Sequence, residues 1–135
     1  MLGRLTSACA AVATRRVFSG PAARFADDAA RAGARTFSYR FGWRAPASGL
    51  GACHCIELPF LFGARAAWQD APMLRGADWD AEIEPRGALL RAAWLRFVRE
   101  GSPSTEALPW PPHAPGAGPT VVPDTAAARN GHTRR

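Results

Sequence analysis

The chain has 135 residues, which suits a single domain, and 47% of them are apolar. Many of the apolar residues are Ala, and 13 Gly and 12 Pro residues interrupt regular structure, so we do not expect a compact core for the whole chain. The net charge is +6 and every basic residue is Arg, but the arginines are scattered, which argues against nucleic-acid binding and against attachment to a membrane surface.

The two ends of the chain differ in composition from its middle. The first 26 residues carry Arg, Ser and Thr, and no acidic residue precedes Asp27, which is typical of a transit peptide; part of a helix from a longer chain is the alternative. We therefore expect a helix or leader at 1–15, the main domain at 16–125 and a disordered tail at 126–135. The three Cys residues, an odd number, do not argue for an oxidising compartment, so we expect a cytoplasmic protein.

Two adjacent segments indicate the fold class. Gly20 and Pro21 begin a helix over 21–32, because Pro is favoured at the first helical position. Residues 35–43 alternate aromatic side chains with polar or small ones, which predicts a β-strand. A helix followed closely by a strand is half of a βαβ unit, so we expect an α/β fold.

The remaining segments are assigned from periodicity and from Gly and Pro. Apolar residues at helical spacing predict a helix over 87–100, which Gly101 and Pro103 end. The other expectations are a helix at 5–18, a loop at 45–52, and a short helical turn or an irregular buried segment at 56–62. A weakly patterned stretch at 63–85 with Trp68 and Trp79 as anchors, an irregular segment at 108–119 and a short strand at 120–122 follow.

His54 is the candidate for a catalytic side chain. It lies on a Gly-rich loop after the predicted strand, where α/β enzymes place reactive groups; a structural histidine is the alternative. Cys53 and Cys55 do not complete a metal site with it, because three consecutive residues cannot easily occupy three corners of a tetrahedron. We expect both cysteines to pack as small apolar residues rather than act as nucleophiles, and we expect neither a metal nor a cofactor.

The segment around His54 resembles the histidine loop of type-B carboxylesterases. The shared pattern is Gly51-Ala52, then His54, then Glu57-Leu58 and an aromatic-rich run that ends in Phe62-Gly63. Further features occur in the family's order on both sides: Phe18, Pro21 and Ala26, then Ala34 and Tyr39-x-Phe41, then Trp94-x-x-Phe97, Gly101-x-Pro103 and Trp110-Pro111. Together these motifs cover about residues 16–122.

The resemblance implies an α/β-hydrolase fold and a serine hydrolase that acts on small carboxylic esters. His54 would then be the general base, which takes a proton from a serine hydroxyl and returns it to the leaving alcohol. Glu57 lies three residues away on the same loop, whereas the family takes its acid from an earlier loop. We therefore expect Glu57 to cap the following helical turn.

The rest of the expected triad is not in this sequence. Alpha/beta hydrolases order serine, acid and histidine along the chain, and no Gly-x-Ser-x-Gly motif occurs here. The acids before His54 are Asp27, which can pair with Arg31, and Asp28; the family places their helix away from the site.

We therefore expect the C-terminal fragment of an α/β-hydrolase fold, with an incomplete sheet and no activity alone. It would be a gene remnant, a mis-assigned reading frame or one part of a split enzyme. The alternative function is a non-enzymatic interaction fragment that docks onto a partner chain.

Overall fold

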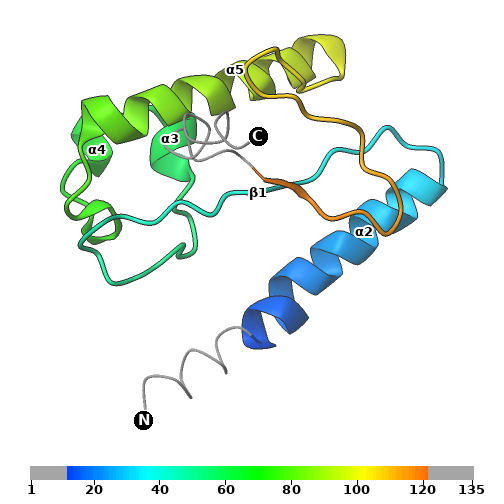
Figure 1. The fold of residues 1–135 in the computed structure, drawn as a ribbon, viewed down its shortest axis with the longest axis horizontal. Coiled ribbons are helices and arrows are strands. Elements are labelled where there is room, and N and C mark those ends of the chain that lie inside the picture. The colour runs from blue at the N-terminus through cyan, green and yellow to red at the C-terminus, as the bar shows by residue number, and fades with distance from the viewer. Residues whose placement is uncertain (1–11, 122–135) are drawn as a thin grey trace, which may run out of the picture. The chain divides into compact units, whose positions relative to one another are not determined.

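The computed structural model describes residues 12–121, which form helices joined by long loops (Figure 1). These residues divide into two compact units, one of residues 12–38 and 111–120 and the other of residues 39–110 with Val121. Among the described residues, no helix is long and apolar enough to cross a lipid bilayer.

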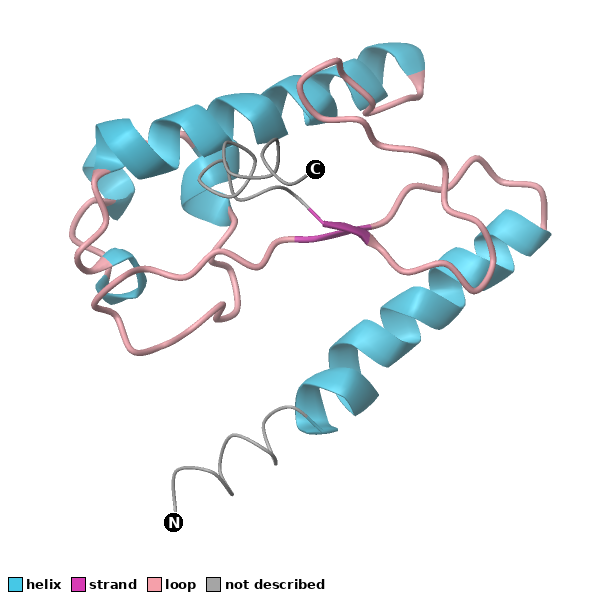
Figure 2. Cartoon of the chain, in the orientation of Figure 1, coloured by secondary structure: helices cyan, strands magenta, loops and turns pink. Residues whose placement is uncertain are grey.

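The elements follow one another with few strands, as the colouring of Figure 2 makes plain. In chain order they are η1 (Arg15–Ser19), α2 (Gly20–Arg31), β1 (Tyr39–Arg40), α3 (Leu58–Phe62), α4 (Arg65–Trp68), η2 (Pro72–Leu74), η3 (Trp79–Ile83), α5 (Glu84–Glu100) and β2 (Thr120–Val121).

The first unit contains the predicted helix at 21–32, which is confirmed as α2 with Pro21 in its first turn. The helix ends at Arg31, and the turn that follows it contains Gly33, whose φ of +84° is a conformation that residues other than Gly disfavour. The helix expected at 5–18 is confirmed for residues 12–18, of which residues 15–18 belong to the wider π-helical turn η1; residues 5–11 lie outside the described part.

The strand predicted at 35–43 is much shorter in the structure, where only Tyr39–Arg40 forms β1. A strand needs a partner for its backbone hydrogen bonds, and within residues 12–121 the two-residue strand β2 is the one that pairs with it. The predicted alternation nevertheless describes the packing. The Phe41 and Trp43 rings both lie against Phe60, with centroids 4.8 and 4.9 Å away.

The second unit is built around Phe60, which is completely buried. Trp79 is buried in the same cluster and Trp68 packs against it, as the sequence predicted for the stretch 63–85. The other buried members of this cluster are Trp43, Ala45, Ile56, Leu74, Ile83 and Leu90.

Helix α5 begins at Glu84, three residues before the predicted start at 87. The reason lies upstream, where the Asp78 carboxylate accepts hydrogen bonds from the backbone N–H groups of Asp80 and Ala81, both at 2.9 Å. This cap starts the helical turn η3, which continues directly into α5. Gly101, with a φ of +68°, ends α5 where the sequence predicted.

Helices α3 and α5 approach each other closely at Gly87, and Figure 1 shows α3 lying against α5. A Cβ atom added to Gly87 would lie 2.6 Å from the carbonyl oxygen of Phe60. The Arg91 guanidinium donates a hydrogen bond of 2.8 Å to that same oxygen and also pairs with Glu84. One glycine and one arginine on α5 therefore hold α3 in place.

We expect Gly87→Ala to lower the free energy of unfolding by about 1–3 kcal/mol, the usual cost of overpacking. In a helix with free space, replacing Gly by Ala raises stability by about 1 kcal/mol. A loss of stability in Gly87→Ala would therefore show that the added Cβ meets the Phe60 carbonyl. Urea unfolding followed by tryptophan fluorescence measures it. Gly42→Ala is the matched control, since its added Cβ meets no atom within 4 Å. A Gly87→Ala protein as stable as the wild type would contradict the close approach.

Candidate active-site loop

The loop that carries His54 has a fixed backbone and an exposed side chain. Cys53 packs against the core of the second unit, and Ile56 is 2% exposed. The Ile56 N–H donates to the Cys53 carbonyl (3.2 Å), which closes a turn around His54. His54 itself is exposed, so its imidazole points to solvent from a segment that is held on both sides.

Cys55 has a left-handed backbone, with a φ of +66°. Among the described residues it is the one position other than Gly with a positive φ. Such a conformation costs of the order of 1–3 kcal/mol and is often found at functional sites, where the surrounding structure maintains it. The Leu58 N–H donates to the Cys55 carbonyl (3.1 Å) and so helps to hold this turn, which directly follows His54.

The His54 imidazole has no hydrogen bond or ion pair with any residue of the described range 12–121. Glu57 is at the N-cap position of α3, but the prediction that its carboxylate caps the turn is wrong, because no such hydrogen bond forms. The reason is its helical backbone (φ −76°, ψ −20°), whereas capping side chains usually start from an extended one.

The Glu57 carboxylate acts on Tyr39 instead. The pKa of the Tyr39 hydroxyl is raised above its ordinary value, first because the ring is half-buried and second because the negative charge of Glu57 disfavours a phenolate. The Tyr39 ring also packs edge-on against Trp110, with 5.1 Å between the centroids. Glu57 therefore disfavours ionisation of Tyr39 and does not cap α3.

A second polar cluster lies in the first unit and connects Ser38, His113 and Asp27. Hydrogen bonds join Ser38 Oγ to His113 Nδ1 (3.1 Å) and His113 Nε2 to Asp27 Oδ1 (2.7 Å). This is a serine–histidine–aspartate chain, the arrangement that activates a serine in many hydrolases. The His113 side chain, however, is only 2% exposed, so it is buried where a catalytic base would need to reach a substrate.

Backbone hydrogen bonds show what this cluster does in the fold. The His113 N–H donates to the Thr36 carbonyl (2.8 Å), and the Gly116 N–H donates to Asp27 (3.0 Å). The segment 111–116 is therefore fastened to α2 through a satisfied polar network, which we name the His113 clasp. The sequence did not reveal it, because Asp27 and His113 are 86 residues apart and His113 stands in a segment without periodicity.

The predicted pair of Asp27 and Arg31 is present at 3.4 Å, next to a pair of Arg31 with Asp28. In the part of the chain that the structure describes, no three His, Cys, Asp or Glu side chains are grouped as metal ligands.

Comparison with known proteins decides the family. The model of the carboxylesterase family matches residues 3–128. The chain belongs to the carboxylesterase family. Among its relatives are a probable N-octanoylanthranilate hydrolase of Rhodococcus erythropolis, 44% identical over 73% of this chain, and the para-nitrobenzyl esterase of Bacillus subtilis, 30% identical over 68%.

Solved carboxylesterases share the fold of this part. A para-nitrobenzyl esterase structure superposes with a TM-score of 0.63 at 33% identity, and a carboxylesterase of Geobacillus stearothermophilus with 0.62 at 32%. They cover 75% and 82% of this carboxylesterase-family chain, which in turn covers 20% and 23% of them. The chain likewise spans 21% and 18% of the two relatives named above. It corresponds to part of an α/β-hydrolase fold.

The chain has a single tyrosine, so the titration of Tyr39 can be followed directly by tyrosinate absorbance. We expect its midpoint above the ordinary value of about 10. Glu57→Gln removes the nearby charge and should lower the midpoint, with burial keeping part of the shift. Glu106→Gln, at an exposed glutamate, is the control. An unchanged midpoint in Glu57→Gln would show that the Glu57 charge does not act on Tyr39.

The hydrogen bond from His113, followed by that from Gly116, lowers the pKa of Asp27. Because the folded-state pKa lies below the unfolded one, Asp27 stabilises the protein above its unfolded pKa. That contribution is lost as the pH falls through the folded value. Thermal unfolding followed by circular dichroism, from about pH 5 to about pH 2, should show a steeper loss of stability for the wild type than for Asp27→Asn.

The control for this measurement is Asp28→Asn, whose carboxylate is 77% exposed and bonds only to Arg31 among the described residues. It should keep the slope of the wild type. Equal slopes for all three proteins would mean that the His113 clasp does not contribute to stability.

Proposed function

We propose that this chain supplies the catalytic histidine, His54, of a serine carboxylesterase whose nucleophile and acid lie outside this sequence. The family membership supports ester hydrolysis as the reaction class. The observation that carries the assignment to His54 is its exposure on a held loop, inside the pattern that resembles the family's histidine loop. His113, by contrast, is buried with both ring nitrogens engaged.

In the proposed reaction, the neutral His54 imidazole accepts the proton of a serine hydroxyl as the serine attacks the ester carbonyl. The imidazolium then donates this proton to the departing alcohol, and the same cycle with water releases the acid. We do not assign Glu57 as the acid that orients the imidazole, because its charge acts on Tyr39.

The proposal includes an incomplete α/β-hydrolase sheet, since β1 and β2 have two residues each. It also includes a small carboxylic ester as substrate, as the names of the relatives, which are hydrolases or esterases, suggest. A sequence without a Gly-x-Ser-x-Gly motif does not contain the usual nucleophile of this fold.

The purified chain should hydrolyse para-nitrophenyl esters no faster than free imidazole does. Removing the serine from a comparable triad costs about a million-fold in rate, and each oxyanion donor contributes roughly 3 kcal/mol. Initial rates of the wild type, His54→Ala and Ser38→Ala measure this. We expect equal rates that do not saturate with substrate.

Ser38→Ala is included because of the serine–histidine–aspartate arrangement of the His113 clasp. A saturable rate that Ser38→Ala abolishes and His54→Ala leaves intact would overturn the proposal and assign the activity to the clasp. A serine labelled by a fluorophosphonate would lead to the same conclusion.

A further inference from the structure

Most residues of the helix formed by residues 12–31, through η1 and α2, are exposed. Ala26 is its single buried residue within the described part. Large apolar side chains stand in solvent along it: Val17 is 60%, Phe18 64% and Phe25 77% exposed. Phe18 and Phe25 are seven residues apart, about two helical turns, and so lie on one side of the helix. We name this side the aromatic stripe.

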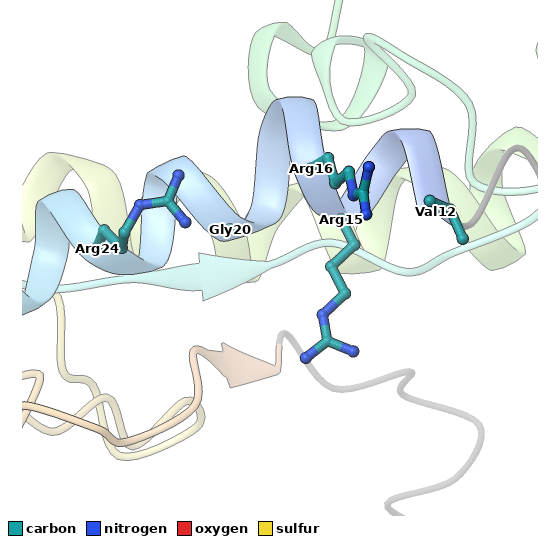
Figure 3. A pocket seen from close by; sticks show the side chains of 5 residues that line it. All are labelled: Val12, Arg15, Arg16, Gly20 and Arg24. Carbon is teal, nitrogen blue, oxygen red and sulfur yellow. The ribbon is translucent and has the colours of Figure 1, made fainter.

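A second side of the same helix is basic. Val12, Arg16, Gly20 and Arg24 follow each other at four-residue spacing, and with Arg15 they line an open depression of about 740 Å³. Figure 3 shows the guanidinium of Arg24 turned toward Gly20. Within residues 12–121, no carboxylate pairs with the arginines of this basic stripe, in contrast to Arg31 on the same helix.

We propose that these two stripes form a docking surface for a polypeptide that carries the rest of a carboxylesterase fold. The family model begins at residue 3, so this helix belongs to the family's domain. The chain covers only about a fifth of the solved carboxylesterases, whose fold it shares at TM-scores of 0.62 and 0.63. Most of the domain to which the helix belongs is therefore outside this chain.

The chemistry of the surface specifies what it would contact. Aromatic side chains are frequent at the centres of protein interfaces, where they are fully desolvated. Three arginines that form no ion pair with the described residues favour a partner with carboxylates on its surface, and attraction between the two makes binding dependent on salt. An anionic membrane would also attract a helix with basic and aromatic sides. The match of the whole helix to a domain family favours the protein partner.

This inference rests on the proposed function, since the same missing part would supply the nucleophile, but its test measures binding and not catalysis. The probe is the N-octanoylanthranilate hydrolase of Rhodococcus erythropolis, shortened by the region that matches this chain. Its tagged form is produced together with the full chain and purified through the tag. We expect the two to copurify in equal amounts, and we expect the affinity to fall as salt is added.

Phe25→Ser tests the aromatic stripe and should weaken binding at least about tenfold, as the loss of a central aromatic residue does at other interfaces. Ala23→Ser is the matched control, because it introduces the same residue at an exposed position outside the aromatic stripe of the same helix. It should bind like the wild type. Arg16→Ala with Arg24→Ala should remove most of the salt dependence.

If the shortened relative is insoluble alone, its soluble yield is the second measurement. The wild-type chain should raise that yield and Phe25→Ser should not. Absence of both copurification and rescue would overturn the docking surface, as would a complex that Phe25→Ser leaves unchanged. Binding to phosphatidylserine vesicles in place of the protein would overturn it in favour of a membrane. A complex that forms without esterase activity would contradict the role of His54 and leave the docking surface intact.

Discussion

The close approach of α3 to α5 at Gly87 is the contact on which the His54 loop depends. Glycine allows the Phe60 carbonyl to approach the helix, and Arg91 donates a hydrogen bond to that oxygen. Phe60 can then fill the centre of the second unit, where the Phe41 and Trp43 rings meet it. Because α3 directly follows the loop that carries His54, the position of α3 fixes the C-terminal end of that loop. Packing around Phe60 therefore holds the loop backbone, while the His54 imidazole stays exposed to solvent.

Two histidines of the chain illustrate how burial separates chemical roles. His113 is buried and has a partner on each ring nitrogen, which makes it a fastening between α2 and the segment 111–116. His54 is exposed on a strained turn and is free to meet a group from outside the described residues. A serine–histidine–aspartate chain of hydrogen bonds is thus insufficient to define a catalytic site. Access of a substrate to the histidine is also required.

The exposed aromatic residues of η1 and α2 and the shortness of the strands have a common physical origin. A helix buries one side against another layer, and a strand needs a neighbour for its backbone groups. This chain covers about a fifth of the carboxylesterases that it resembles in structure, so many of those layers and neighbours lie outside it. The second unit is held by its own apolar cluster, in which Trp43, Phe60 and Trp79 are buried. The two-residue strands β1 and β2 are too short to form a core of their own.

The sequence by itself determined the local elements and the loop that carries the candidate histidine. The start of α2 and the ends of α2 and α5 agree with the positions of Pro21, Gly33 and Gly101. The backbone preferences of Pro and Gly act locally and need no distant partner. Only the tertiary structure decided the length of β1, the inability of Glu57 to cap α3 and the clasp of Asp27 with His113. The length of β1 and the clasp depend on which distant groups come within hydrogen-bonding distance, whereas Glu57 does not cap because its own backbone is helical. The periodicity of a sequence records the side of an element that is buried, and it does not record the residue that will lie opposite.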